Sequence, residues 1–390
     1  MHRVTRRQFT LGMSSLGLTS LTPAHASLPD GRIAIIDTTF NAAKEPWLTH
    51  LQERGVTSII RYYARQPALS KRCNVSETKC MAFNVVNGKP EPHHICRKGM
   101  SIISLFQYQS NKPEKFLNYK TEAPADAEAA WRQATEICEQ PKGTAIYFGV
   151  DLQMHDGNKQ LINAVIEYFK IIKHSKIGKN YELGVYGNGY TSRILMTEQR
   201  LVKFSWISAS RGHSETPKTI SCGNWHLFQN NLDRHWTLGK NQCKGGFSLD
   251  TNVQNPAHLY AGAWNMDGPV MADAARTQAI FDQRRFARCD APVYRAPDLN
   301  AGLIERQQCK EVGLDTYKLV PDQAVGASYN VRVLKEEGDW LLVDIDEDGI
   351  ADGYCRKAQF TENFRTMPSF KRGQCGGADS LQPLAVCQRS

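Results

Sequence analysis

The sequence predicts an α/β fold, in which a (β/α)8 TIM-like barrel is followed by a small all-β unit. Eight short apolar runs, most of them ending in a polar or charged residue, follow one another over about 225 residues from Arg32 onward. Stretches with apolar residues at helical spacing separate several of these runs. Beyond Pro256 the pattern changes to short alternating segments with acidic and glycine-containing turns, which are typical of a small β structure.

Each apolar run is interpreted as one barrel strand because it is short and bounded by polar residues. The runs are those ending at Asp37, then 58–63, 101–108, 145–151, 183–187, 204–210, 225–229 and 247–250. Helices are expected at 46–55, 125–140 and 159–175. Continuous apolar strands separated by helices indicate a parallel sheet buried on both faces, with short or absent helices near the end of the barrel.

The first 26 residues are expected to be an export signal and not part of the fold. A basic start contains Arg6 and Arg7, an apolar stretch covers 9–21, and Ala24-His25-Ala26 suits cleavage. The order Thr-Arg-Arg-Gln-Phe resembles a twin-arginine signal. No later run is long and apolar enough to span a bilayer, so we expect a soluble mature protein, periplasmic or secreted.

Composition predicts further boundaries and limits the partners. The barrel is expected over 27–262, a linker over 263–284, the all-β unit over 285–362, and a tail over 363–390 pinned by a disulfide.

Removing the signal lowers the formal charge from +9 to +6, because three arginines and no acids leave. This mild excess suits an anionic wall polymer, and no basic run with interleaved aromatics indicates nucleic-acid binding. We expect a monomer.

Eleven cysteines are many for a chain kept reduced. In an oxidising envelope they predict up to five disulfides with one thiol left over. Zinc is the alternative, but no Cys-x-x-Cys occurs, and His93-His94-x-Cys96 alone is a weak signal. The sequence therefore favours disulfides and predicts neither metal nor cofactor.

Candidate site residues lie at the carboxyl ends of the strands, which meet at one mouth in an α/β barrel. Asp37, Asp151 and Asp250 are the candidate catalytic residues. Candidate substrate-binding residues are Arg61, Tyr62, Gln107, Gln153, Tyr186, Trp206 and Gln229. Acids ringed by aromatic and amide groups suit a sugar polymer, since glycosidic cleavage uses a protonated acid and a carboxylate. The alternative for any single aspartate is a helix cap or turn, and the aromatic residues, Trp206 above all, could be barrel packing.

The order of the motifs IIDTT, YFGVD, GVYG, FSWISAS, WHLFQ and FSLDTNV resembles the glycoside-hydrolase-like domains of the domain of unknown function 1906 group. These are similar to the family 25 lysozymes, which cleave the peptidoglycan glycan. The resemblance covers roughly residues 30 to 260. It implies that Asp37 is the first-strand aspartate, Asp151 the first acid of an Asp-x-Glu, and Asp250 the last-strand aspartate. Gln153 stands at the place of the general acid.

That departure leaves two hypotheses open. Glutamine can hydrogen-bond a glycosidic oxygen but cannot protonate it, and losing a general acid removes about 10²- to 10⁴-fold of rate. In the first, the barrel cleaves cell-wall glycan with Asp151 as the leading acid. In the second, it binds glycan without cutting it.

The C-terminal unit resembles a bacterial SH3-like domain, on the residues CDAPVYRAPDLNAGLIER, NVRVLKEEGDWLLVDID and ADGYC. The resemblance implies a small all-β SH3-like barrel that targets peptidoglycan. A third hypothesis follows, in which this unit carries the function and the barrel is a scaffold.

Acidic residues within this unit are spaced as in a calcium loop, at Asp344, Asp346, Asp348 and Asp352 around Gly349. The twelfth position, which calls for glutamate, is Cys355, and the flanks read as strands. An acidic hairpin turn is the favoured interpretation, with calcium as the alternative.

Overall fold

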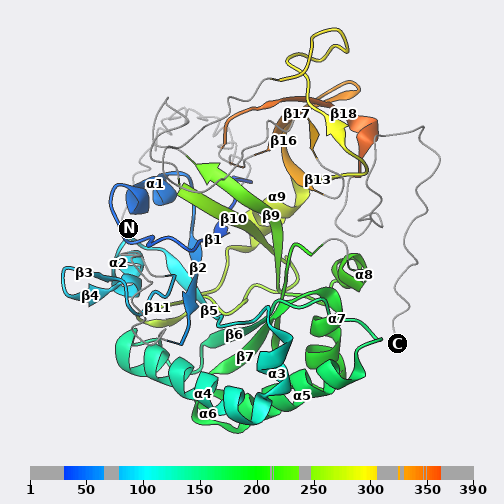
Figure 1. Cartoon of the computed structure of the whole chain (residues 1–390). Coiled ribbons are helices and arrows are strands. Elements are labelled where there is room, and N and C mark those ends of the chain that lie inside the picture. Colours follow the sequence, from blue (N-terminus) through cyan, green and yellow to red (C-terminus); the bar gives the residue numbers. More distant parts are fainter. Residues whose placement is uncertain are drawn as a thin grey trace, which may run out of the picture.

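The structure is a computed structural model that describes residues 30–65, 79–210, 213, 215–236, 247–304, 324–325, 329–345, 347 and 349–361 (Figure 1). All eight predicted runs form strands, and together they close one barrel through the pairing of β5 with β6. The barrel strands are β1 (Ile35–Asp37), β2 (Ser58–Tyr63), β5 (Ser101–Phe106), β6 (Ala145–Val150), β7 (Glu182–Gly187), β8 (Phe204–Ile207), β9 (Leu227–Trp236) and β10 (Phe247–Gln254). The TIM-like barrel prediction is confirmed at this level.

The expectation of an all-parallel sheet is wrong for the last strand, β10. Strands β1 to β9 of the barrel pair in parallel, but β10 is antiparallel to both β9 and β1. Only the ten residues 237–246 separate β9 from β10, and a parallel crossover needs a dozen or more. The two strands therefore form a hairpin, and the amino-terminal half of β10 lies at the mouth.

The three predicted helices are present, and several shorter ones join them. They correspond to α1 (Trp47–Glu53), α4 (Tyr119–Trp131) with its π-helical extension η1 (Arg132–Ile137), and α5 (Lys159–His174). The others are α2 (Glu91–Arg97), α3 (Pro113–Leu117), α6 (Lys176–Asn180), α7 (Gly189–Ser192), the π-helical η2 (Arg193–Glu198) and α8 (Glu215–Cys222). The apolar face of α5, with Val165 and Phe169, is buried, and the Asn158 side chain caps its first turn.

Residues 263–284, expected to be a linker, belong instead to the packed barrel. Strand β11 (Trp264–Asn265) pairs with β5 and with β12 (Gly268–Pro269), and α9 (Ala274–Asp282) follows. The Trp264 indole is fully buried and donates to the Ser104 hydroxyl at 2.9 Å. A segment that buries a tryptophan in this way cannot act as a free tether.

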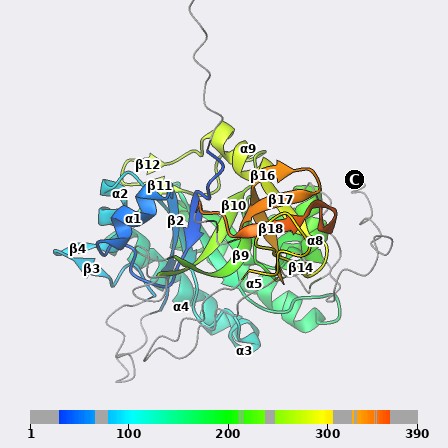
Figure 2. The ribbon, with the colours of Figure 1, turned by 90° about the horizontal axis from the view of Figure 1, so that it is seen from above.

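The C-terminal unit is all-β, as predicted. Its five-stranded sheet has the order β18-β17-β16-β13-β19. These strands are β13 (Arg284–Ala287), β16 (Asn330–Glu337), β17 (Trp340–Asp344), β18 (Gly353–Arg356) and β19 (Phe360–Thr361), with the 3-10 turn η3 (Lys357–Gln359). Two further antiparallel strand pairs lie outside the main sheets: β14 (Ala291–Pro292) with β15 (Ala324–Val325), and β3 (Val85–Val86) with β4 (Lys89–Pro90). The sheet lies over β9 and β10 (Figure 2).

The expectation of up to five disulfides with one thiol left over is too high. Cys80, Cys96, Cys138 and Cys355 are not disulfide-bonded, whereas Cys222 and Cys289 are. Four unbridged cysteines among eleven leave at most seven for bridges, which is too few for five disulfides. The predicted signal and the tail with Cys375 and Cys387 lie outside the described residues. Within the described part of the chain, no helix is long and apolar enough to cross a membrane.

Candidate functional site

Asp37, the last residue of β1, is the centre of a buried hydrogen-bond cluster at the mouth. Its Oδ1 accepts from the Tyr62 hydroxyl at 2.7 Å, and its Oδ2 accepts from the Asn252 and Gln229 amides at 2.8 and 3.1 Å. The side chain is almost fully buried, and this desolvation raises the pKa of the Asp37 carboxyl, against the opposing effect of the three donors. A carboxylate held by three donors has a fixed orientation.

Gln229 joins Asp37 to the second predicted aspartate. Its Nε2 also donates to Asp250 Oδ2 at 2.9 Å, while its Oε1 accepts from the Tyr186 hydroxyl at 3.0 Å and the Ala209 N–H at 3.3 Å. Both protons and both lone pairs of this amide are therefore used. The amide fixes two carboxylates side by side.

Asp250 reaches the mouth for a reason other than the one the sequence suggested. It is not at the end of its strand but within β10, opposite Asp37 in the antiparallel pair. The pairing of β10 with β9 shifts register on either side of Thr251, next to Asp250. Such bulges commonly redirect a side chain near a functional site.

Aromatic residues of the barrel interior support this cluster. The Trp206 indole donates to Asn252 Oδ1 at 2.9 Å and packs on Tyr186 with ring centroids 4.4 Å apart. Trp206 is almost fully buried, so in this structure it contributes packing and orientation. Burial, and next the neighbouring aspartates, raise the pKa values of Tyr62 and Tyr186 well above the usual range, which keeps both as hydroxyl donors.

Asp151, the third predicted aspartate, follows β6 and is exposed. Its backbone N–H is held by the Ser110 carbonyl at 3.0 Å, but its carboxylate makes no hydrogen bond to the part of the chain that is described. The charges of Asp151, Asp37 and Asp250 each contribute to the raised pKa of Tyr186. Partial desolvation raises the pKa of the Asp151 carboxyl, and the Lys79 ammonium opposes this.

Lys79 is a site residue that the sequence analysis did not identify. Its ammonium lies 4.3 Å from the centre of the Tyr62 ring and donates to Gln107 Oε1. Desolvation lowers the pKa of Lys79, while Asp37, Asp151 and Asp250 each raise it. One cation thus acts on three carboxylates, and Gln107 lies beside this cation.

Two predicted substrate-binding residues stand apart from the cluster. Arg61 is fully buried and forms a two-pronged ion pair with Glu91, with N–O distances of 2.6 and 2.9 Å. Side chains alternate along β2, so Tyr62 points to Asp37 while Arg61 points to α2. Gln153 is exposed, and no contact within the described residues ties it to the aspartates.

Asn252 could have been found from the sequence, whereas Lys79 could not. Asn252 lies two positions beyond Asp250 on one strand and so shares its face. Lys79 lies in a loop outside the barrel strands, where periodicity carries no information about direction.

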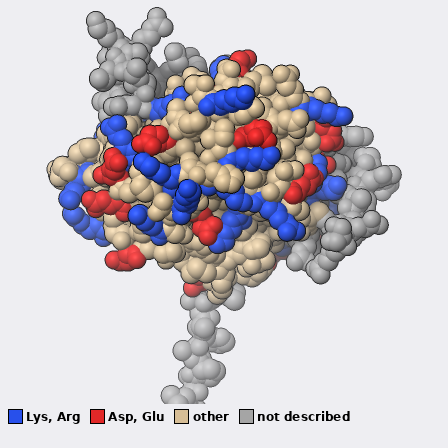
Figure 3. Space-filling view, turned by 90° about the horizontal axis from the view of Figure 1, so that it is seen from below, with Lys and Arg blue, Asp and Glu red and all other residues tan. Residues whose placement is uncertain are grey.

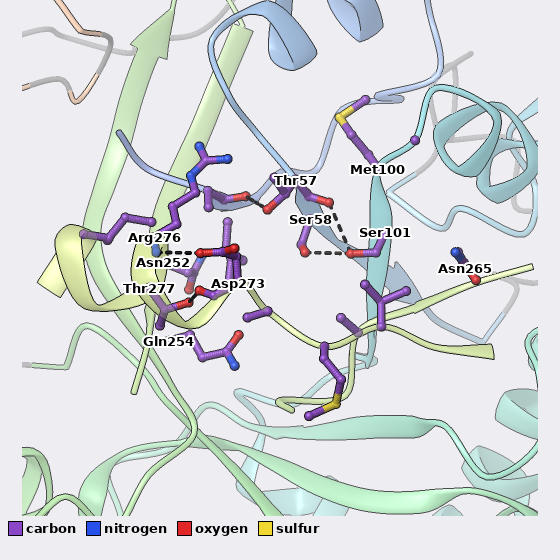
Figure 4. A pocket seen from close by; sticks show the side chains of 18 residues that line it. Thr57, Ser58, Met100, Ser101, Asn252, Gln254, Asn265, Asp273, Arg276 and Thr277 are labelled. Atoms are coloured by element: carbon purple, nitrogen blue, oxygen red, sulfur yellow. Dashed lines mark hydrogen bonds between the residues drawn. The ribbon is translucent and has the colours of Figure 1, made fainter. Parts of the chain in front are cut away.

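A separate cavity of about 260 Å³ lies at the opposite end of the barrel (Figure 4). It is lined by the first residues of β1, β2 and β5 and by α9. Ser58 and Ser101 share a hydrogen bond of 2.7 Å in its wall, and Arg276 and Asp273 lie across from them. This cavity is therefore separate from the place where the aspartates lie. On the face seen in Figure 3, basic and acidic side chains are interspersed.

No metal site emerges from the described residues, where no three His, Cys, Asp or Glu side chains are grouped closely enough to hold an ion. In the acidic loop, Asp344 accepts from the Gly349 N–H at 2.8 Å and Asp352 from the Ile345 N–H at 2.6 Å. These carboxylates shape a hairpin turn between β17 and β18. Asp346 and Asp348 lie outside the described residues.

Comparison with known proteins gives one family and several distant folds. A family model described as Rv2525c-like, glycoside hydrolase-like domain matches residues 49–267, which is more than half of the chain. The match includes Asp151, Gln229 and Asp250 and begins after β1, so Asp37 lies outside it. A search of curated proteins finds no match.

The similar solved structures share little sequence with this chain. The Tat-secreted protein Rv2525c of Mycobacterium tuberculosis, in complex with L-tartrate, is 19% identical with a TM-score of 0.44, and covers 57% of this chain and 95% of its own. A family 25 glycosyl hydrolase from Bacillus anthracis is 10% identical with a TM-score of 0.33, covering 59% and 91%. A GH18 chitinase from Pseudoalteromonas aurantia is 10% identical with a TM-score of 0.32, covering 49% and 72%.

Proposed function

The chain belongs to the Rv2525c-like, glycoside hydrolase-like family, and from this premise we propose that its barrel acts on bacterial cell-wall glycan, with Asp37, Asp151 and Asp250 as catalytic residues. The observation that carries the proposal is the arrangement of these three acids. Two carboxylates share one amide donor, while the third is exposed and, like the other two, contributes to the raised pKa of Tyr186. Glycosidic cleavage needs this division between charged carboxylates and a proton donor.

Asp151 is the proton donor in this proposal. Its carboxyl is exposed to a substrate and has a raised pKa, so it holds a proton to higher pH than an ordinary aspartate. Asp37 and Asp250 supply negative charge where a sugar ring develops positive charge at its anomeric carbon. Gln229 keeps them oriented, and Tyr186 holds Gln229.

A non-catalytic glycan-binding function is the second candidate, and two observations favour it. Gln153 stands at the position where the resemblance to family 25 lysozymes implies a glutamate. The Lys79 ammonium lowers the pKa of Asp151 and so works against its protonation. In this second candidate function, the barrel binds sugar through the residues at its mouth and does not cleave it, since a fold alone does not imply an activity.

The finer parts of the proposal concern where the protein acts. The twin-arginine-type signal supports export to the periplasm or beyond. The all-β unit at the C-terminus supports an SH3-like role in wall targeting. Peptidoglycan is the glycan that both features favour.

One experiment separates cleavage from binding. Mature protein is incubated with purified peptidoglycan, and new reducing ends and co-sedimentation are measured together. Cleavage predicts new reducing ends from the wild type and a loss of about 10²- to 10⁴-fold in Asp151→Asn. Co-sedimentation without reducing ends supports the binding function. If neither reducing ends nor co-sedimentation is observed, both functions are refuted.

The control variant is Asp282→Asn, which removes an exposed carboxylate at the end of α9, far from the mouth. It should leave cleavage and co-sedimentation at the wild-type level. A loss in this variant equal to that of Asp151→Asn would show that the assay reports net charge and not the site.

A further inference from the structure

The acidic loop between β17 and β18 places one carboxylate, Glu347, against the outer face of the barrel strand β9. Glu347 is almost fully buried, and its Oε1 accepts from the Asn230 and Asn231 amides of β9 at 2.8 and 2.7 Å. Its Oε2 pairs with the buried Arg284 guanidinium at 2.7 Å. All three of these partners come from outside the hairpin of Glu347, and the calcium-like spacing did not indicate them.

The backbone of Glu347 is unusual in a way that fits this insertion. Its φ of 57° lies in the left-handed region, which residues other than glycine rarely adopt. Asp344 and Asp352 hold the loop on either side by accepting backbone N–H groups of Gly349 and Ile345. Such a conformation persists only where the surroundings over-determine it.

The partners of Glu347 are the neighbours of the site residues. Asn230 follows Gln229, and its side chain lies on the opposite face of β9. Its Oδ1 accepts from the Thr251 hydroxyl at 2.9 Å, and Thr251 follows Asp250 at the register shift of β10. Asn330 of β16 adds two more bonds to Asn230, at 2.9 and 3.2 Å. The outer face of the bulge is therefore bound to the C-terminal sheet.

We propose that Glu347 is a positioning residue for the barrel site. Through Asn230 and Thr251 it holds the β9–β10 hairpin in the bulged register that brings Gln229 and Asp250 against Asp37. The C-terminal unit is then part of the scaffold of the site and not a detachable targeting module. This inference rests on the site of the proposed function but not on its chemistry, because it concerns only how the aspartates are held.

The structure offers a readout of the site that needs no glycan. The Trp206 indole N–H donates to Asn252, which donates to Asp37, so its NMR resonance follows ionisation of Asp37. The Gln229 amide lowers the pKa of Asp37. If the Gln229 amide no longer donates to Asp37, the Asp37 carboxyl should ionise at higher pH, and the midpoint followed by the Trp206 resonance should move with it.

The test compares full-length Glu347→Gln with Leu341→Ala, a matched variant that truncates a buried side chain of the C-terminal core and keeps Glu347. Both variants should lower Tm. Only Glu347→Gln should raise the pH midpoint of the Asp37 titration followed at the Trp206 N–H, by about half a pH unit or more. Trp206→Phe identifies the resonance.

A second variant covers the case in which Glu347→Gln does not fold. Thr251→Val keeps the shape of the side chain and removes only its bond to Asn230, so a smaller shift in the same direction is expected. Equal midpoints in wild type, Leu341→Ala, Glu347→Gln and Thr251→Val would overturn the proposal. An unshifted midpoint with intact glycan cleavage would refute this inference alone, whereas a shifted midpoint without any glycan activity would refute only the proposed function.

Discussion

Asp37 of β1 and Asp250 of β10 are partners across an antiparallel strand pair, and one nitrogen of Gln229 donates to both carboxylates. Two buried or half-buried carboxylates that share one donor nitrogen repel each other when both are charged. The amide between them offsets part of that repulsion. The arrangement makes the stability of the site sensitive to pH.

Gln229→Ala should destabilise the protein by roughly 1–3 kcal/mol at pH 7, because two carboxylates lose a shared donor. Desolvation already raises the pKa of Asp37, and losing the amide raises it further. The native state then binds protons more tightly than the unfolded state, so stability of the variant falls as pH rises through this window. Denaturant unfolding at pH 5 and pH 7 should show a smaller loss at pH 5.

Gln254→Ala is the matched control for that measurement. Gln254 lies on the neighbouring strand β10 and donates to the His258 carbonyl, with no carboxylate involved. Its loss of stability should differ little between the two pH values. An equal pH dependence in both variants would contradict the role assigned to Gln229.

Lys79→Met should raise the pKa of Asp151, since the Lys79 ammonium is the group that lowers it. Carboxyl ¹³C NMR titration measures this shift directly, without any substrate. In a cleavage assay the alkaline limb should move to higher pH, because Asp151 stays protonated longer. Lys203, just before β8, is paired with Glu182 at the start of β7, and Lys203→Met should leave the titration of Asp151 unchanged. A downward shift in Lys79→Met would sink the assignment.

Gln153→Glu should increase release of reducing ends from peptidoglycan, since it restores an acid where the lysozyme resemblance implies the proton donor. A gain of about 10²-fold or more is expected if proton donation limits the wild type. The control is Gln199→Glu, the same change at an exposed position after η2. No gain in Gln153→Glu, with wild-type glycan binding, would argue for a purely binding barrel.

Glu91→Gln should cost about 3–5 kcal/mol in free energy of unfolding, because it leaves the Arg61 guanidinium charged and buried without its partner. Glu167→Gln breaks an exposed pair with Lys170 and should cost less than about 1 kcal/mol. Urea denaturation compares the two. Comparable small losses would mean that Arg61 is not the structural residue its burial indicates.

The strands were predictable because apolar runs of this length have few alternatives once they must be buried on both faces. All eight strands overlap the predicted runs, although β9 and β10 extend beyond their predicted ends. Alternation along β2 could also have separated Tyr62 from Arg61, since adjacent side chains point to opposite faces. The direction of β10 was harder to predict, because it follows from the length of the connection before it and not from the composition of the strand.

The sequence by itself determined the barrel, the all-β unit after it, and three aspartates and an amide at or near the strand ends, because burial and periodicity are local properties of a chain. Only the tertiary structure decided that Asp250 reaches the mouth from within an antiparallel strand, that Lys79 joins the acids, and that Glu347 ties the second unit to the site. Each of these depends on contacts between residues far apart in the chain. Such contacts are fixed by the closing of the sheet and the packing of one unit on another, and spacing along a sequence does not encode them.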